Sequence, residues 1–222
     1  MAIALVTQTT AFASATTSKV VTITSPTSGD CLVMSFGGTG FPQISGVSGG
    51  GVTTWTLLKK SGYSNFNAEL WFGIVDTTPS TSVTITFGAT STGSINLSEW
   101  SGIKTSGAAD ATSTSAATTT TKGAGSITAS TYPSVVISVA FHNSTTSPSG
   151  GPTASFTALT EAKDASGYCN NTSYRIWTGA PSAVDPEWTI ASQDWEGVSG
   201  VLLGATGVTS RDPFGMSGFF GV

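Results

Sequence analysis

The sequence carries little charge for its size. Only 9% of the 222 residues are Asp, Glu, Lys or Arg, whereas soluble domains usually carry about 25%. Lys and Arg together number 8, they are scattered along the chain, and the formal net charge at pH 7 is −4. So few cations cannot form the basic patch that neutralises a phosphate backbone, so we expect no nucleic-acid partner.

Catalytic and metal-binding residue types are also scarce. The chain has one histidine, His142, and two cysteines, Cys31 and Cys169, all far apart in sequence. A hydrolytic triad needs a base beside its nucleophile, and a zinc site needs several His or Cys ligands at short spacing. His142 directly follows a predicted strand, where a structural role is the ordinary one. We therefore expect no catalytic residue, no cofactor and no metal.

The 12 acidic residues leave few pairs for glycoside hydrolysis, which uses two carboxyl groups facing each other across a cleft. Asp194 and Glu196 would share one face of a strand, and Glu69 and Glu99 each lie close to a tryptophan. Neither pair recurs in the internal repeat described below, so an enzyme is the less favoured interpretation. Oxygen ligands for calcium surround Tyr168 without the dense acidic spacing of calcium loops: Asp164, Asn170 and Asn171.

Long hydrophobic runs are missing as well. No stretch of about 18 apolar residues exists, so we expect no membrane span. Residues 11–15 imitate a small-residue cleavage site, but no basic segment precedes them and polar residues 7–10 interrupt the apolar run. We therefore expect no signal peptide. In a chain that stays in a reducing cytosol, Cys31 and Cys169 are expected to be free thiols.

Ser, Thr and Gly dominate the composition, yet 38% of the residues are hydrophobic, which is enough to offset the entropy of ordering. Short β-branched or alternating segments, such as 31–36, 82–87 and 134–141, are separated by Gly, Pro, Asn and Asp. No segment has a helical period of useful length. The sequence predicts an all-β protein, an antiparallel β-sandwich of the jelly-roll or immunoglobulin-like type.

The strongest internal signal is a pseudo-repeat of about 105 residues. The loop motif at 61–63, Ser-Gly-Tyr, recurs at 166–168, and the same offset relates Leu97 to Leu202. Such self-similarity predicts one strand pattern used twice. Each half alone would have a small core, so we predict a single sandwich over 1–208. It would be built from two interleaved strand repeats, at about 20–103 and 125–208.

Two segments have special composition. Residues 104–125 are almost entirely Ala, Thr, Ser and Gly, which is consistent with a linker or with an exposed edge strand. Residues 209–222 form a Gly-rich tail with three Phe and one Met, and so apolar a tail needs a surface to dock on, its own sandwich or a partner. The residues predicted to dock on a partner are Ile3, Leu5, Phe214, Met216, Phe219 and Phe220.

The tryptophans divide into two groups. Trp71 and Trp177 occupy matching places in the two repeats and are predicted to be core aromatics that hold the two sheets together. The other candidates could form a stacking platform for a glycan, as carbohydrate-binding sandwiches do: Trp55, Trp100, Trp188 and Trp195.

Five strand motifs stand out in the first half of the sequence: Gly29-Asp30-Cys31-Leu32-Val33-Met34, Trp55-Thr56-Leu57, Glu69-Leu70-Trp71-Phe72, Ser82-Val83-Thr84-Ile85-Thr86-Phe87 and Glu99-Trp100-Ser101-Gly102-Ile103. They resemble one family of β-sandwich modules, found in tailed-phage virion proteins and in bacterial surface or secreted proteins. Members read Gly-Asp-Leu-Leu-Val-Val, Trp-Thr-Leu, Glu-Leu-Trp-Tyr, Val-Thr-Val-Thr-Phe and Glu-Tyr-Ser-Gly-Val. The resemblance covers about residues 1–208, with Trp100 where Tyr is usual, and the aromatic tail lies outside it.

The resemblance implies a jelly-roll-like sandwich with a structural or adhesive role and no catalytic residues. We therefore expect a non-enzymatic structural protein of a tailed-phage virion, assembled in the host cytoplasm. A capsid decoration or minor capsid protein attached through its termini is the leading interpretation, and a minor tail protein is its variant. Such a protein would bind the major capsid protein or other virion proteins and form homo-oligomers. The alternative is a module that binds carbohydrate or a host surface.

Overall fold

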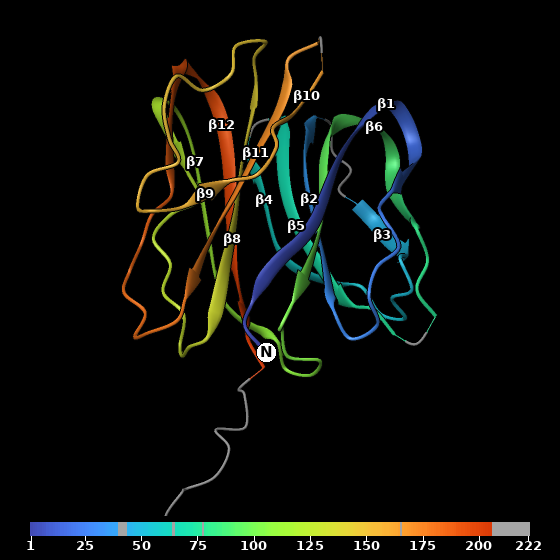
Figure 1. The fold of residues 1–222 in the computed structure, drawn as a ribbon. Helices are drawn as coiled ribbons and strands as arrows, with labels where there is room; N and C mark the ends of the chain where they lie inside the picture. Colours follow the sequence, from blue (N-terminus) through green and yellow to red (C-terminus); the bar gives the residue numbers. More distant parts are fainter. Residues whose placement is uncertain (40–43, 64, 77, 165, 206–222) are drawn as a thin grey trace, which may run out of the picture.

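The computed structural model describes residues 1–39, 44–63, 65–76, 78–164 and 166–205, and this part of the chain contains strands and no helix (Figure 1). The prediction of an all-β sandwich is confirmed. The strands are β1 (Ala4–Thr22), β2 (Cys31–Thr39), β3 (Ile44–Gly49), β4 (Thr56–Tyr63), β5 (Phe66–Ile74), β6 (Ser82–Ser101), β7 (Ala109–Gly123), β8 (Ser134–Asn143), β9 (Thr157–Ala158), β10 (Ala162–Lys163), β11 (Tyr168–Trp177) and β12 (Glu187–Leu203).

Two antiparallel sheets form from these strands, and they share one strand order. The first sheet runs β1-β6-β2-β5-β4, with β3 against β6. The second runs β7-β12-β8-β11-β10, with β9 against β11. Each strand of the first path corresponds to the strand six places later in the chain. This correspondence confirms the pseudo-repeat of about 105 residues.

The predicted interleaving of the two repeats is wrong. Every strand of the first repeat lies in the first sheet, and every strand of the second repeat lies in the second sheet. The reason is that each repeat acts as one structural unit: its strands pair with one another, and the apolar face of its sheet is buried against the other repeat. The repeats meet face to face, so the single sandwich consists of one sheet from each.

The spacing of the repeat is not uniform. Leu97 of β6 is paired with Met34 of β2, and Leu202 of β12 is paired with Val135 of β8. Leu97 and Leu202 are 105 residues apart, but their partners are 101 residues apart. The two sheets therefore repeat a strand order and not a strict residue-by-residue register.

Residues 104–125, for which the sequence left two interpretations open, contain an edge strand. β7 pairs with β12 on one side and is the last strand of its sheet. Its threonines at 118–121 are exposed. β-branched polar residues favour extended backbone without demanding burial, which suits this position.

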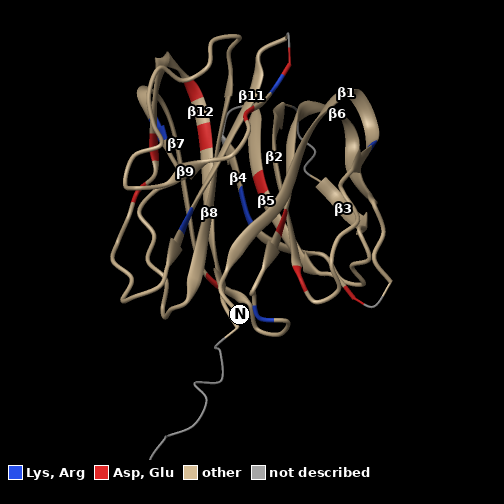
Figure 2. Cartoon of the chain, viewed as in Figure 1, with Lys and Arg blue, Asp and Glu red and all other residues tan. Residues whose placement is uncertain are grey.

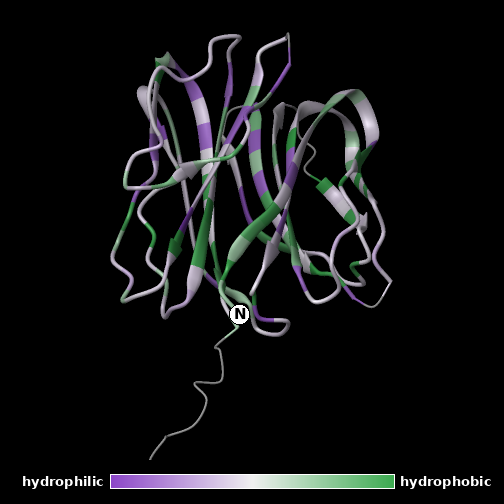
Figure 3. Cartoon of the chain, viewed as in Figure 1, coloured by the Kyte–Doolittle hydropathy of each residue, from purple (hydrophilic) through white to green (hydrophobic). Residues whose placement is uncertain are grey.

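The space between the sheets is filled by the largest hydrophobic cluster of the structure. β2 and β8 lie at its centre and are buried on both faces, as the near-continuous apolar sequence of residues 31–36 predicts. In Figure 3 the lower part of β8 and of β12 is hydrophobic. Residues of both sheets contribute, among them Val33, Leu70, Trp100, Ile137, Phe141, Val198 and Leu202.

Two glycines let the sheets approach closely. A Cβ added at Gly37 of the first sheet would lie 2.6 Å from Cβ of Phe141 in the second. Conversely, a Cβ added at Gly200 of the second sheet would lie 2.6 Å from Cγ of Leu58 in the first. Each sheet thus inserts one large side chain over a glycine of the other.

Beside the apolar cluster, the sheets are joined by buried hydrogen bonds. The Ser35 and Thr172 hydroxyl oxygens are 2.7 Å apart, and the Asn170 side-chain amide donates to Ser35 Oγ at 3.3 Å. Asn96 of the first sheet donates to the Thr160 carbonyl oxygen at 3.1 Å. The Ser35, Asn96, Asn170 and Thr172 side chains are nearly inaccessible to water, so each needs a partner, and these bonds fix how the sheets align.

Smaller clusters cover the outer faces. β1 and β6 pass irregularities near Thr16 and then fold back with β3 over the outer side of their own sheet, which gives the first repeat a second core (Figure 1). Trp71 packs against this outer cluster, and Trp177 belongs to the outer cluster of the second sheet. The prediction that these two tryptophans hold the sheets together is therefore wrong.

The tryptophan between the sheets is Trp100. It is fully buried in the central cluster, and its ring meets the Tyr174 ring edge-on with centroids 4.8 Å apart. Strand alternation explains the error at Trp71, because residues one position apart point to opposite faces of a sheet. Met34, opposite Trp71, points outward in the same way.

We predict that Gly37→Ala and Gly200→Ala each destabilise the protein by about 1–3 kcal/mol, because the added methyl group overpacks the contact between the sheets. Urea unfolding followed by tryptophan fluorescence measures the change. Gly179→Ala is the matched control, because nothing lies within 4 Å of a Cβ there. Equal midpoints for the Gly37 and Gly179 variants would contradict the prediction.

Candidate functional site

The most unusual chemical environment in the described residues is a buried polar cluster on the outer face of the second sheet. We call Lys122, Glu161, Cys169 and Asn171 the lysine cluster. Cys169 and Asn171 lie two positions apart on β11, so they share one face. Lys122 comes from the end of β7, where it is paired with Trp188, and Glu161 directly precedes β10.

The lysine cluster is held by a chain of hydrogen bonds. Lys122 Nζ donates to Asn171 Oδ1, and Asn171 Nδ2 donates to Glu161 Oε1 at 2.7 Å. Cys169 Sγ donates to the same Glu161 oxygen at 2.8 Å, and Ser147 Oγ donates to Glu161 Oε2 at 2.7 Å. One carboxylate therefore accepts from three side chains, while the amide of Asn171 links that carboxylate to the lysine.

Burial changes the acid–base properties of this cluster. The Lys122 side chain is fully buried, and this desolvation lowers its pKa to about 7 although Glu161 favours the charged form. Burial alone would raise the pKa of Glu161, but the hydrogen bonds from Cys169, Ser147 and Asn171 outweigh it and lower that pKa. The cluster thus combines an amine that is readily neutral with an ionised carboxylate.

Neither His142 nor Cys169 is suited to nucleophilic catalysis. Burial, together with the charge of Lys122, lowers the pKa of His142 to about 3. Its Nδ1 lies 2.6 Å from Gln193 Nε2, so the ring is occupied by a structural contact. Burial and the bond to Glu161 raise the pKa of Cys169 to about 12, so the thiol stays protonated. Both cysteines are free thiols, as predicted.

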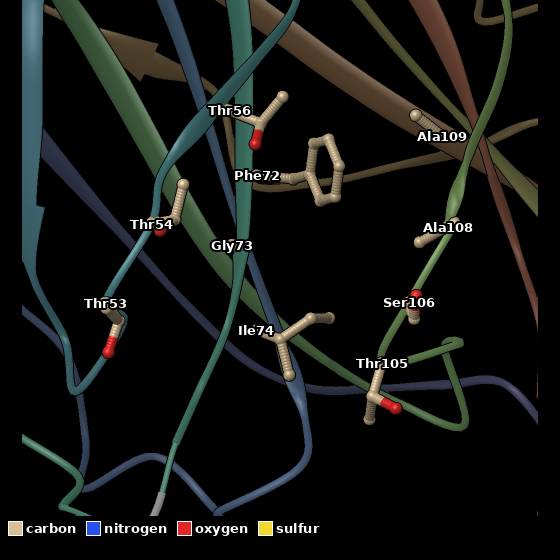
Figure 4. Close-up of a pocket in the computed structure, with 11 residues that line it drawn as sticks. Thr53, Thr54, Thr56, Phe72, Gly73, Ile74, Thr105, Ser106, Ala108 and Ala109 are labelled. Carbon is tan, nitrogen blue, oxygen red and sulfur yellow. The ribbon is translucent and has the colours of Figure 1, made fainter.

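A cavity of about 360 Å³ opens between the first sheet and the segment that leads into β7 (Figure 4). Its walls are hydroxyl groups and apolar surface, and none of its lining residues is charged. Such a lining offers hydrogen bonds but neither a base nor an acid. The residues that line it are Thr53, Thr54, Thr56, Phe72, Gly73, Ile74, Thr105, Ser106, Gly107, Ala108 and Ala109.

The predicted glycan platform is not formed. Trp100, Trp188 and Trp195 have exposed fractions of 0%, 3% and 5%, so they cannot present a ring to a sugar. Trp55 is half-buried and donates from Nε1 to the Gly49 carbonyl oxygen. The alternating pattern and the aromatic content predicted tryptophan rings on the surface of a sheet. The sequence does not show that other parts of the chain cover these rings.

The predicted docking residues are only partly placed. Ile3 has an exposed fraction of 6% and belongs to the central cluster, and Leu5 is half-buried against that cluster. Neither side chain is therefore available to a partner in this structure. Val6 is the exposed apolar residue beside them, at 49%. The tail residues lie outside the described part of the chain: Phe214, Met216, Phe219 and Phe220.

The acidic residues considered for hydrolysis do not face each other across a cleft. Glu69 accepts hydrogen bonds from the Trp71 indole at 2.8 Å and from the Ile44 backbone at 2.9 Å. Glu196 is fully buried. Asp194 is half-buried and accepts a hydrogen bond from the Thr118 hydroxyl group. None of these acids lines the cavity.

Asp30 and Glu99 form a different kind of pair. Glu99 accepts from the Thr27 backbone at 2.7 Å, and Asp30 lies against it in a mostly buried position. Burial, together with the charge of Glu99 and a hydrogen bond to it, raises the pKa of Asp30 to about 6. Asp30 therefore keeps its proton to a higher pH than an exposed aspartate does.

No family model, curated protein or solved structure matches the chain. Within the described residues, no group of three or more His, Cys, Asp or Glu side chains could hold a metal ion. The calcium ligands considered above serve other bonds: Asp164 accepts from the Tyr168 backbone, and Asn170 donates to Ser35. No helix among the described residues is long and apolar enough to cross a membrane.

Sequence reasoning missed the lysine cluster. Lys122 ends a run of threonines on an edge strand, where a lysine ordinarily faces water. A weak signal was present, because a lone lysine in a strand next to Gly123 and Ala124 has no charged neighbour in sequence to pair with. Its burial depends on a contact between the end of β7 and Asn171 of β11, beyond the irregularity in the β7–β12 ladder, which no local pattern indicates.

We predict that Asp30 contributes stability that is lost as the pH rises from about 4 to about 6. Unfolded Asp30 ionises near 3.8 and folded Asp30 near 6, so the folded state binds more protons in this window and gains from low pH. Asp30→Asn removes the group that titrates. The change in Tm between pH 4 and pH 6 should therefore differ between the variant and the wild type by a few degrees. Thermal melts of both proteins in matched buffers measure the difference, and parallel pH curves would refute the assignment.

Proposed function

We propose that the protein is a non-enzymatic structural protein of a tailed-phage virion, of the capsid-decoration type, with a minor tail protein as the variant within this class. The family resemblance supports the proposal. So does the chemistry of the described residues, which provides rigid packing and buried hydrogen bonds and no cleft with facing carboxylates.

The observation that carries the proposal is that the first and the last described residues lie close together. Ala205 donates from its backbone to the Gly102 carbonyl oxygen at 2.8 Å, and a Cβ at Gly102 would lie 3.0 Å from the Ile3 nitrogen. The start of β1 and the end of β12 therefore meet at one pole of the sandwich (Figure 1). In the sequence, the aromatic tail at 209–222 comes shortly after Ala205, the last described residue.

Attachment through one pole would present the rest of the sandwich as a rigid body. Charged residues are few along the strands (Figure 2), so long-range electrostatic attraction contributes little to binding. Binding would instead rest on apolar burial by the tail residues, among them Phe214, Phe219 and Phe220. The module would add buried area between shell subunits, and this would raise the barrier to rupture of the shell.

The alternative role is binding to a glycan on a host surface. The aromatic platform predicted for this role is not available, since three of the four candidate tryptophans are buried. What remains is the hydroxyl-lined cavity beside Phe72. Binding on a broad glycan array that is abolished by Thr54→Val would favour this alternative over the structural role.

The test of the proposed function is the number of copies on purified particles. A decoration protein should co-purify with intact particles in many copies, a minor tail protein in a handful. A chain ending at Val208 should keep its melting temperature, because β12 ends at Leu203, but should be lost from the particles.

A matched pair of variants makes this prediction specific. Phe219→Ser with Phe220→Ser removes apolar side chains from the tail, whereas Val20→Ser removes an exposed apolar side chain from β1. The double variant should lose at least tenfold in particle binding, about 1.4 kcal/mol, whereas the control should bind normally. Normal decoration by the chain ending at Val208 would refute the role of the tail.

A further inference from the structure

We infer that Lys122 and Asn171 form an intramolecular isopeptide bond, in which the lysine amine attacks the asparagine side-chain carbonyl and ammonia leaves, with Glu161 carrying the proton. This modification is independent of the proposed attachment function. It rests on the placement of the three side chains and on the burial of Lys122 and Asn171, beside which Glu161 is half-buried.

The first support is proximity. Lys122 Nζ is in hydrogen-bond contact with Asn171 Oδ1. Because the carbonyl carbon is bonded to Oδ1 at about 1.2 Å, the amine nitrogen lies within about 4 Å of the carbon that it would attack. Holding a nucleophile and its target together in this way replaces a bimolecular encounter and lowers the barrier substantially.

The second support is the state of the amine. Only a neutral amine is a nucleophile, and a surface lysine is almost entirely protonated at neutral pH. Lys122 has an exposed fraction of 0%, and burial brings its pKa to about 7. The Trp188 ring, whose centroid is 5.9 Å from Nζ, helps to exclude water from this side chain.

The third support is Glu161, which already holds the leaving group. Its Oε1 accepts a hydrogen bond from Asn171 Nδ2 at 2.7 Å. As an ionised carboxylate it can take the proton that the attacking amine loses and pass it to Nδ2, as a general base and then a general acid. The carbon–nitrogen bond of the amide then breaks, ammonia departs and Glu161 is ionised again. The atoms balance without any further reactant: an amine and a primary amide give a secondary amide and ammonia.

The first repeat has an apolar residue, Val21, at the position that corresponds to Lys122. Val21 is paired with Val83 one position from the outer end of the β1–β6 ladder, as Lys122 is paired with Trp188 in the β7–β12 ladder. Val21 is 2% exposed and packs in an apolar cluster. A buried lysine in the second repeat costs desolvation that valine does not, so its position has a role beyond packing.

The bond would join residues 49 positions apart in the chain. It would fasten the folded-back end of β7, an edge strand, to β11, which lies three strands away in the sheet order. The edge that the sheet leaves unpaired would thereby be tied covalently to its interior.

Intact-protein mass spectrometry of the full chain under denaturing conditions tests the inference. The purified protein should be lighter than its calculated mass by one ammonia molecule. After trypsin digestion, the peptides containing Lys122 and Asn171 should be joined, and cleavage after Lys122 should be absent. A full mass, or a loss of ammonia with Lys122 still cleaved by trypsin, as a cyclised asparagine would give, overturns the inference.

Variants separate the three roles. Lys122→Met should restore the full mass. Asn171→Asp should lose water in place of ammonia and reach the same final mass as the cross-linked wild type. Glu161→Gln should slow bond formation at least a hundredfold in a time course after expression. Lys163→Met is the matched control, because this exposed lysine contacts Ser147 at 3.0 Å and should leave the cross-link intact.

Discussion

The fold depends on the face-to-face contact between the two sheets, in which both central strands, β2 and β8, are buried on both sides. Water reaches neither face, so the side chains must fill the space between the sheets and every buried polar group must find its hydrogen-bond partner within the contact. Gly37 and Gly200 make close packing possible, since each leaves room for a large side chain from the opposite sheet. Ser35, Asn170 and Thr172 satisfy the polar part and fix the alignment.

Much of this architecture could be predicted from the sequence. Alternating β-branched segments separated by turn residues identify an all-β sandwich, and the recurrence of Ser-Gly-Tyr identifies the duplication. The sequence could not assign strands to sheets, because similarity between repeats shows which strands are equivalent and not which strands pair. It also placed Trp71 on the wrong face, because the choice between faces depends on register.

The functional groups were harder to predict than the fold. Lys122 and Glu161 are far apart in sequence, and both belong to polar segments that would ordinarily face solvent. They are brought together by Asn171 of β11, which bonds to both, and this arrangement depends on the whole second sheet. Three of the four proposed stacking tryptophans were misassigned for the same reason: burial is a property of the tertiary structure.

The start of β1 and the end of β12 lie together at one pole, and this has a mechanical consequence. The strands in Figure 1 run broadly from that pole toward the opposite one. A pull between the two poles would act along the strand axes and would strain many rungs of each ladder in parallel. Hydrogen bonds that are loaded together resist more force than hydrogen bonds broken one after another, so the orientation of the sheets stiffens the molecule along the strand direction.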